Sequence, residues 1–128
     1  MEYKEYGSKN NDIIILLHGG GLSWWNYIDE ISLLENEFHI VIPILDGHSG
    51  SDTNFTSIES NALEIINFIN KNYNGKVKLI GGLSLGGQIL LEILSKNPNI
   101  CECAIIESAL VIPRDFTYKM IEPIFNLS

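Results

Sequence analysis

The 128 residues are enough for one domain or a part of one, and a hydrophobic fraction of 45% is ordinary for a globular protein, which argues against disorder. The formal net charge of −8 argues against nucleic acid or anionic membrane as a partner, because both are polyanions. No apolar run approaches the roughly 20 residues that cross a bilayer, and residues 1–9 lack the apolar core of a signal peptide, so we expect a cytoplasmic protein.

In the first part of the chain, short apolar runs alternate with longer amphipathic segments. Residues 3–6 alternate weakly in polarity and predict an edge strand, and the continuous apolar run 13–17 predicts a strand covered on both faces. Ser23 is the expected cap of a helix over 24–36. Residues 39–45 predict a second buried strand.

The same alternation continues after a turn-rich segment at 46–52. Residues 56–59 have the form of a capping box and predict the start of a helix. The apolar side chains on one face of this helix are Ile58, Ala62, Ile65, Ile66, Ile69 and Tyr73. A strand over 76–81, a helix over 85–97 and a strand over 100–106 are predicted to follow.

Strand–helix–strand repeats of this length require parallel pairing, because the crossover helix carries the chain back across the sheet. We therefore predict an α/β fold of three layers, with a mostly parallel sheet between helices. Reactive residues in such sheets gather at the carboxyl ends of the strands. Strand 100–106 would be a hydrophobic edge if nothing paired beyond it, so we expect self-association through that edge.

A serine motif lies at one of these strand ends. Gly82-Leu83-Ser84-Leu85-Gly86 matches G-x-S-x-G at a predicted junction of strand and helix. A tight turn there would lift the serine hydroxyl above the sheet, and glycines would avoid collisions of Cβ atoms. Ser84 is therefore the candidate nucleophile. The alternatives are a capping serine with packing glycines and, since G-K-[ST] and G-x-G-x-x-G are lacking, less favourably a phosphate loop.

A second glycine-rich segment, His18-Gly19-Gly20-Gly21, directly follows the first buried strand. Attack on an ester carbonyl creates an oxyanion, which fixed N–H donors stabilise. We expect one donor to be the amide of Leu85 and the other to be Gly20, with Gly21 as second choice. A flexible turn that only starts a helix is the alternative. His18 is expected to be packed and hydrogen-bonded rather than a catalytic base.

The two cysteines are expected to be reduced and buried. Cys101 and Cys103 are two positions apart, so their side chains leave a strand on the same side and a disulfide between them would be strained. Two sulfurs without a second Cys/His pair do not make a zinc site.

Together these segments resemble the α/β-hydrolase family over about residues 13–112. Residues 16–21, followed by two tryptophans, look like the oxyanion segment of that family, and residues 82–87 match its nucleophile turn in full. The loop at 43–52 is similar to the loop after its second strand, from which it departs at Ile44, Asp46 and Ser49. The resemblance further implies substrate contacts at Gly19, Gly21 and Trp24.

The family's catalytic order is serine, acid, histidine, whereas the three histidines here, His18, His39 and His48, all precede Ser84. Glu107 lies near the position where some members hold their acid, but a structural or substrate-facing role is favoured for it. We therefore interpret residues 1–128 as a partial hydrolase domain without its general base. Residues 113–128 resemble the start of a cap over the site, in which Phe116, Met120 and Phe125 would line an acyl pocket; a terminal helix packed on the sheet is the alternative.

The sequence thus predicts a serine hydrolase that acts on a small-molecule carboxylic ester or related acyl compound, with no metal or organic cofactor. A non-catalytic ligand-binding or interaction domain, or an inactive fragment on the same fold, is the alternative. Little turnover is expected from this chain alone, because a serine without its base is a weak nucleophile.

Overall fold

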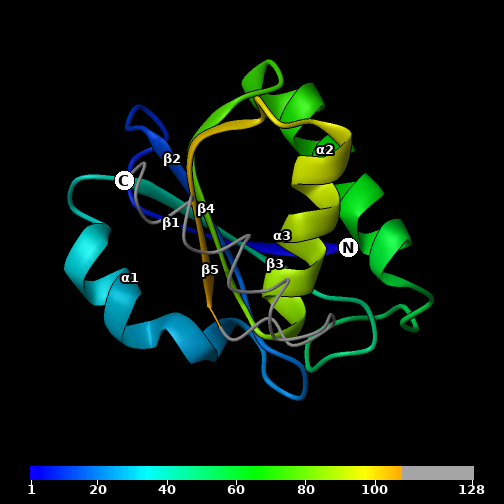
Figure 1. Ribbon diagram of the computed structural model, residues 1–128. Helices are drawn as coiled ribbons and strands as arrows, with labels where there is room; N and C mark the ends of the chain where they lie inside the picture. Colours follow the sequence, from blue (N-terminus) through cyan, green and yellow to red (C-terminus); the bar gives the residue numbers. More distant parts are fainter. Residues whose placement is uncertain (108–128) are drawn as a thin grey trace.

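Five strands form one sheet in the order β1-β3-β2-β4-β5 in the computed structural model, which describes residues 1–107 (Figure 1). The strands are β1 (Glu2–Tyr6), β2 (Ile13–Leu17), β3 (His39–Ile44), β4 (Val77–Leu83) and β5 (Cys101–Glu107). β1 pairs antiparallel with β3 at one edge, and all other pairs are parallel. The predicted edge strand and the mostly parallel sheet are confirmed.

Helices cover both faces of this sheet (Figure 1). The long helices α2 (Ile58–Tyr73) and α3 (Leu85–Lys96) lie on one face, and the 3₁₀ turn η1 (Trp24–Tyr27) with the short helix α1 (Ile28–Leu34) lies on the other. The three predicted layers are therefore confirmed. Among residues 1–107, no helix is long and apolar enough to cross a membrane.

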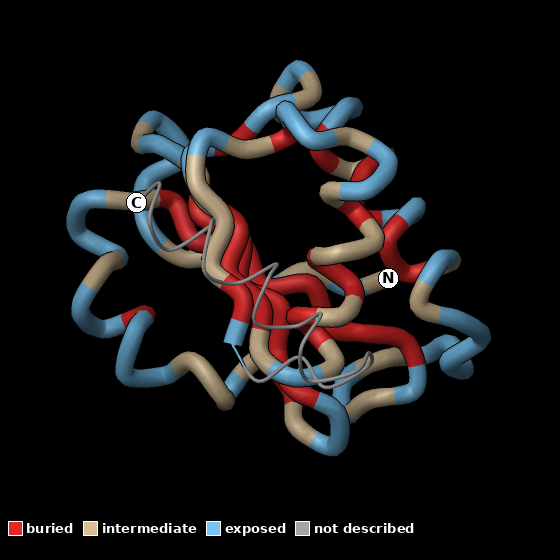
Figure 2. The backbone as a smooth tube through the Cα atoms, viewed as in Figure 1, coloured by how far each residue is buried: buried red, intermediate tan, exposed pale blue. Residues whose placement is uncertain are grey.

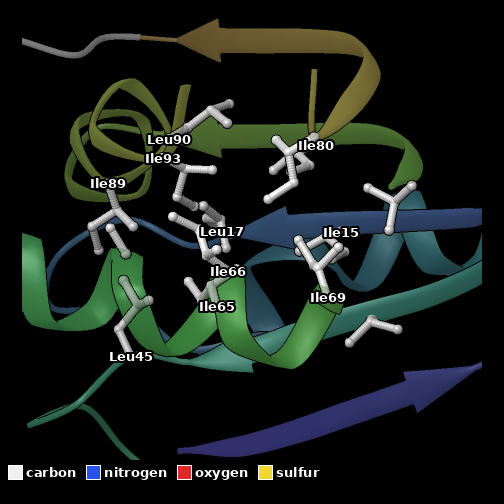
Figure 3. Close-up of a cluster of buried hydrophobic side chains, with 14 of the residues drawn as sticks. Ile15, Leu17, Leu45, Ile65, Ile66, Ile69, Ile80, Ile89, Leu90 and Ile93 are labelled. Carbon is white, nitrogen blue, oxygen red and sulfur yellow. The ribbon is translucent and has the colours of Figure 1, made fainter. Parts of the chain in front are cut away.

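The alternation of side chains along β2 explains why this strand reads as an unbroken apolar run. Ile15 and Leu17 belong to the larger core between the sheet and the helices α2 and α3 (Figure 3). Ile14 and Leu16 point the other way, into a smaller cluster that includes Ile31 of α1. Figure 2 shows the buried residues gathered along these central strands. A strand buried on both faces needs no polar residue on either.

The side chains predicted to cap two helices do not cap them in the structure. The hydroxyl of Ser23 makes no capping bond; it donates instead to the carbonyl oxygen of Ser49, 2.7 Å away in a distant loop. Helix α2 is capped by Ser57 rather than Thr56, since the Ser57 hydroxyl accepts the N–H of Ser60 at 2.9 Å. The segment predicted as one helix over 24–36 is a 3₁₀ turn followed by α1, which ends at Leu34.

β5 completes the sheet and carries both cysteines. Cys101 and Cys103 are free thiols, as expected, but they are half-buried rather than fully buried, because within residues 1–107 β5 pairs only with β4. Partial burial raises the pKa of the Cys101 thiol to about 11. This thiol is therefore protonated, and hence weakly nucleophilic, at neutral pH.

Candidate functional site

Ser84 occupies the single residue between the last position of β4 and the first position of α3. Its backbone angles, φ 52° and ψ −112°, lie in a region that side-chain-bearing residues rarely adopt. Two backbone hydrogen bonds hold it there: its N–H donates to the carbonyl of Glu107 at 2.8 Å, and its carbonyl accepts the N–H of Gln88 at 3.0 Å. The side chain is exposed and makes no capping bond to α3. The turn is thus a strained backbone that presents an uncommitted hydroxyl, as found at functional sites.

Two glycines allow β4 and α3 to approach each other and β2. A Cβ atom on Gly82 would lie 2.7 Å from the carbonyl carbon of Gly86, which is closer than real contacts allow. A Cβ atom on Gly86 would overlap the carbonyl oxygen of Leu17 and come within 2.8 Å of that of His18. The close packing that the sequence pattern implied is therefore present at both flanking positions.

Replacing Ser84 by glycine is expected to stabilise the fold by about 1 kcal/mol, because glycine adopts positive φ without the strain that serine bears. Chemical denaturation followed by circular dichroism measures the change. Ser84→Ala is the matched control, since alanine removes the hydroxyl but keeps the Cβ atom and the strain. A Ser84→Gly variant no more stable than Ser84→Ala would contradict the presence of strain at this position.

The second glycine-rich loop lies against the serine turn. A Cβ atom built on Gly20 would be 3.6 Å from the Cβ atom of Leu85, so the two predicted oxyanion donors belong to residues in contact. Leu85 is the first residue of α3, and an amide at that position has no acceptor within its own helix. The N–H of Gly19 donates to Asn26 Oδ1 at 3.4 Å, whereas the described residues offer no hydrogen-bond acceptor to the N–H of Gly20 or Gly21.

His18 is fully buried, and both of its ring nitrogens bond to backbone groups, in agreement with a packed rather than basic histidine. The N–H of Leu45 donates to His18 Nε2 at 3.1 Å, and Nδ1–H donates to the carbonyl of Gly19 at 3.0 Å. These partners fix the neutral ring with its proton on Nδ1. Burial, together with the neighbouring ring of His48, lowers the pKa of His18. His18 therefore joins the glycine loop to the end of β3.

The loop after β3 is held by a residue that the sequence analysis did not single out. Asn61 of α2 is fully buried; its Oδ1 accepts the N–H of Asp46 at 3.1 Å, and its Nδ2–H donates to the carbonyl of Ser57 at 2.9 Å. The Asp46 carboxylate in turn accepts the hydroxyl of Thr53 at 2.6 Å. The sequence feature that could have identified Asn61 is its position on the apolar face of the helix. A buried amide there needs hydrogen-bond partners, because leaving it unpaired would cost free energy.

An apolar groove of about 460 Å³ runs between α1 and the strands β2, β4 and β5. Its walls include Leu16, Leu79 and Ile105, and it reaches Leu83 and Glu107, the strand-end residues beside Ser84. Glu107 is exposed at the end of β5, and within residues 1–107 no histidine bonds to Ser84. The groove thus offers an apolar surface next to the strained turn.

Trp24 is partly buried and packs against the smaller core cluster. Its ring is 6.4 Å from that of Tyr6, with Lys4 Nζ 5.6 Å from its centroid. A substrate contact by Trp24 remains a prediction, as do those of Gly19 and Gly21. The predicted cap segment, with Phe116, Met120 and Phe125, lies outside the described residues.

Comparison with known proteins agrees with this arrangement. The sequence profile of the family described as alpha/beta hydrolase fold matches residues 12–124. A solved structure described as a lipase, from Acinetobacter baumannii, is 27% identical with a TM-score of 0.78, covering 92% of this chain and 43% of that chain. A thermophilic esterase from Thermogutta terrifontis is 23% identical with a TM-score of 0.74, covering 82% of this chain and 39% of that chain.

One curated relative is named for acyl transfer. A protein from Cyberlindnera fabianii named "Probable alcohol acetyltransferase" is 29% identical in an alignment of length 102 that covers 77% of this chain and 27% of that protein. The chain therefore spans less than half the length of the two solved structures above and about a quarter of this relative.

Proposed function

Because the chain belongs to the α/β-hydrolase family, we propose that it carries the nucleophile half of a serine hydrolase site acting on a carboxylic ester or related acyl compound. Ser84 Oγ is the attacking atom. The amides of Leu85 and Gly20 hold the oxyanion that forms when the acyl carbonyl is attacked. The bond from the acyl carbon to the alcohol oxygen then breaks, the alcohol leaves with a proton, and water hydrolyses the acyl-enzyme to the carboxylic acid and free Ser84. A cytoplasmic location is part of the same proposal.

One observation supports this proposal above the others: Ser84 is held at positive φ and is exposed, and the neighbouring Leu85 contacts Gly20, in a loop where the N–H groups of Gly20 and Gly21 have no partner among the described residues. Strained residues of this kind cluster at functional sites, where the surrounding structure holds them in place. Donors aimed at a site of developing charge stabilise a transition state by a few kcal/mol each.

The apolar groove beside Glu107 favours an acyl group as the part of the substrate that is bound there. The lipase and esterase names of the two solved structures and the acetyltransferase name of the curated relative all describe chemistry at an acyl carbon. Hydrolysis and transfer to an alcohol share the acyl-enzyme and differ only in the second nucleophile. Water is the simpler second nucleophile and is the one proposed here.

The general base is expected outside residues 1–107. Both ring nitrogens of His18 are bonded to backbone, and those of His39 face Glu5 Oε1 at 2.8 Å and the carbonyl of Gly7 at 3.2 Å. His48 donates from Nδ1 to the carbonyl of Asp46 at 3.1 Å. An unassisted serine acylates slowly, so the test below uses an activated ester and counts acyl groups bound rather than turnovers.

The test is acylation of the chain by a short-chain nitrophenyl ester, measured by intact-protein and peptide mass spectrometry. The expected result is an acyl group on the peptide that contains Ser84, lost in Ser84→Ala. Ser32→Ala, which removes an exposed hydroxyl on α1, is the matched control and should acylate as the wild type does. Equal labelling of the wild type and Ser84→Ala would refute the nucleophile and favour a non-catalytic binding domain.

A further inference from the structure

Three consecutive glycines need outside contacts to hold one conformation, because glycine loses more conformational freedom on folding than any other residue. In the loop after β2 these contacts converge on Gly19. Its carbonyl accepts the Nδ1–H of His18 at 3.0 Å and the N–H of Leu22 at 3.2 Å. Its own N–H donates to Asn26 Oδ1 at 3.4 Å. Both peptide units that flank Gly19 are therefore held by hydrogen bonds.

The held carbonyl of Gly19 fixes the direction of the next amide. The peptide bond from Gly19 to Gly20 is trans, so the N–H of Gly20 points opposite to that carbonyl and away from its two donors. Leu22 closes a four-residue turn whose third residue, Gly21, has a φ of 77°, as in a type II turn. A Cβ atom on Gly20 would contact Leu85, whereas one on Gly21 would meet no atom of the described residues within 4 Å. Gly20 thus carries the oriented amide beside the serine turn.

Asn26 is placed for its contact by the 3₁₀ turn η1, which is fastened at both ends. The buried Ser23, just before η1, accepts the N–H of Asn26 at 3.0 Å and donates its hydroxyl to the loop after β3. At the other end, the hydroxyl of Tyr27 donates to the carbonyl of Leu17 at 2.9 Å. Because the N–H of Gly19 can only donate, the oxygen of the Asn26 amide is the atom that faces it.

We propose that Asn26 is a positioning residue for the oxyanion donor Gly20, acting through its hydrogen bond to Gly19. This inference rests on the proposed function, in which the Gly20 amide stabilises the charge that develops on the attacked carbonyl oxygen. Such a donor is most effective when it is already oriented before the charge forms. The Asn26 oxygen, together with the two donors to the Gly19 carbonyl, supplies this orientation in the absence of substrate.

Backbone order measured by ¹⁵N NMR relaxation tests the positioning directly. The amide of Gly20 in the wild type should be rigid, with an order parameter of about 0.85. Asn26→Leu removes the acceptor and should lower this value below about 0.6, whereas Asn26→Asp keeps an acceptor oxygen and should preserve it. Asn72→Leu is the matched control, because it removes a bond from an asparagine amide to the carbonyl of Phe68 on α2. It should leave Gly20 rigid.

The rate at which a short-chain nitrophenyl ester acylates Ser84 is the second measurement. Asn26→Leu should slow acylation at least about tenfold, since a misplacement of about 1 Å can cost about a hundredfold in rate. Asn72→Leu should acylate at the rate of the wild type. Equal rates in the wild type and Asn26→Leu would overturn the positioning role and leave Ser84 as the nucleophile.

The relaxation measurement can also overturn the role of Asn26 by itself. A Gly20 amide that is disordered in the wild type does so, even if Asn26→Leu does not fold. Equal order of Gly20 in the wild type and Asn26→Leu does so too, because the loop then keeps its shape without this bond. If the wild type is not acylated at Ser84, the proposed function fails separately, and the order of Gly20 still shows whether Asn26 holds the loop.

Discussion

Gly86→Ala is expected to destabilise the fold by about 4 kcal/mol or more, which is a large part of the stability of a domain. The new Cβ atom would overlap the carbonyl oxygen of Leu17, which belongs to the central strand β2. That carbonyl is also fixed from another direction, because the hydroxyl of Tyr27 donates to it at 2.9 Å. Backbone on both sides of the contact leaves no flexible side chain to move away.

The sign of the stability change in Gly86→Ala shows whether the contact with Leu17 or the helix propensity of the new residue dominates. Gly86 lies in α3, and in an ordinary helix the change from glycine to alanine stabilises by about 1 kcal/mol. Urea denaturation followed by far-ultraviolet circular dichroism compares Gly86→Ala with Gly20→Ala, whose Cβ atom would make only an ordinary contact at 3.6 Å. Gly20→Ala should remain near the wild type. A Gly86→Ala variant as stable as the wild type would show that α3 can move away from β2.

The serine turn was predictable because a single short pattern encodes both its local and its tertiary requirements. Gly82 and Gly86 are needed for contacts that the backbone alone defines, so the residue type is fixed wherever the turn occurs. The mostly parallel pairing followed in the same way, from apolar runs such as Ile13–Leu17 and from helices long enough to cross the sheet. These features depend on neighbours in sequence or on backbone geometry.

Side chains that choose between several partners were not predictable. Ser23 has the residue type and position of a helix cap, yet it bonds to Ser49, 26 residues away, and nothing near it in the sequence indicates that partner. Asn61 and Asp46 meet only because α2 packs beside the end of β3. No local pattern predicts the contact of Gly20 with Leu85, because the two loops are more than 60 residues apart in a sequence of 128. It was expected only because nucleophile turns of this kind are known to take an oxyanion donor from the loop after the first buried strand.

Acid is expected to destabilise the protein through His18, beginning as the pH falls below about 6.5, the ordinary pKa of a histidine. Burial lowers the pKa of His18 in the folded chain, so below pH 6.5 the unfolded chain takes up a proton that the folded chain does not. Proton uptake by the unfolded state favours unfolding, and stability is lost progressively until the lowered folded pKa is reached. Above pH 6.5 neither state binds this proton, and the contribution is constant.

The measurement is the free energy of unfolding from pH 5 to pH 8 for the wild type, His18→Gln and His48→Gln. His18→Gln should be less stable at pH 8 by about 1–3 kcal/mol, because it disturbs a buried hydrogen bond to the N–H of Leu45. It should also lose part of the acid dependence. His48→Gln removes only the smaller of the two causes that lower the pKa of His18, and burial remains, so this variant should retain most of that part. Identical pH slopes in the wild type and His18→Gln would mean that His18 binds protons equally in both states.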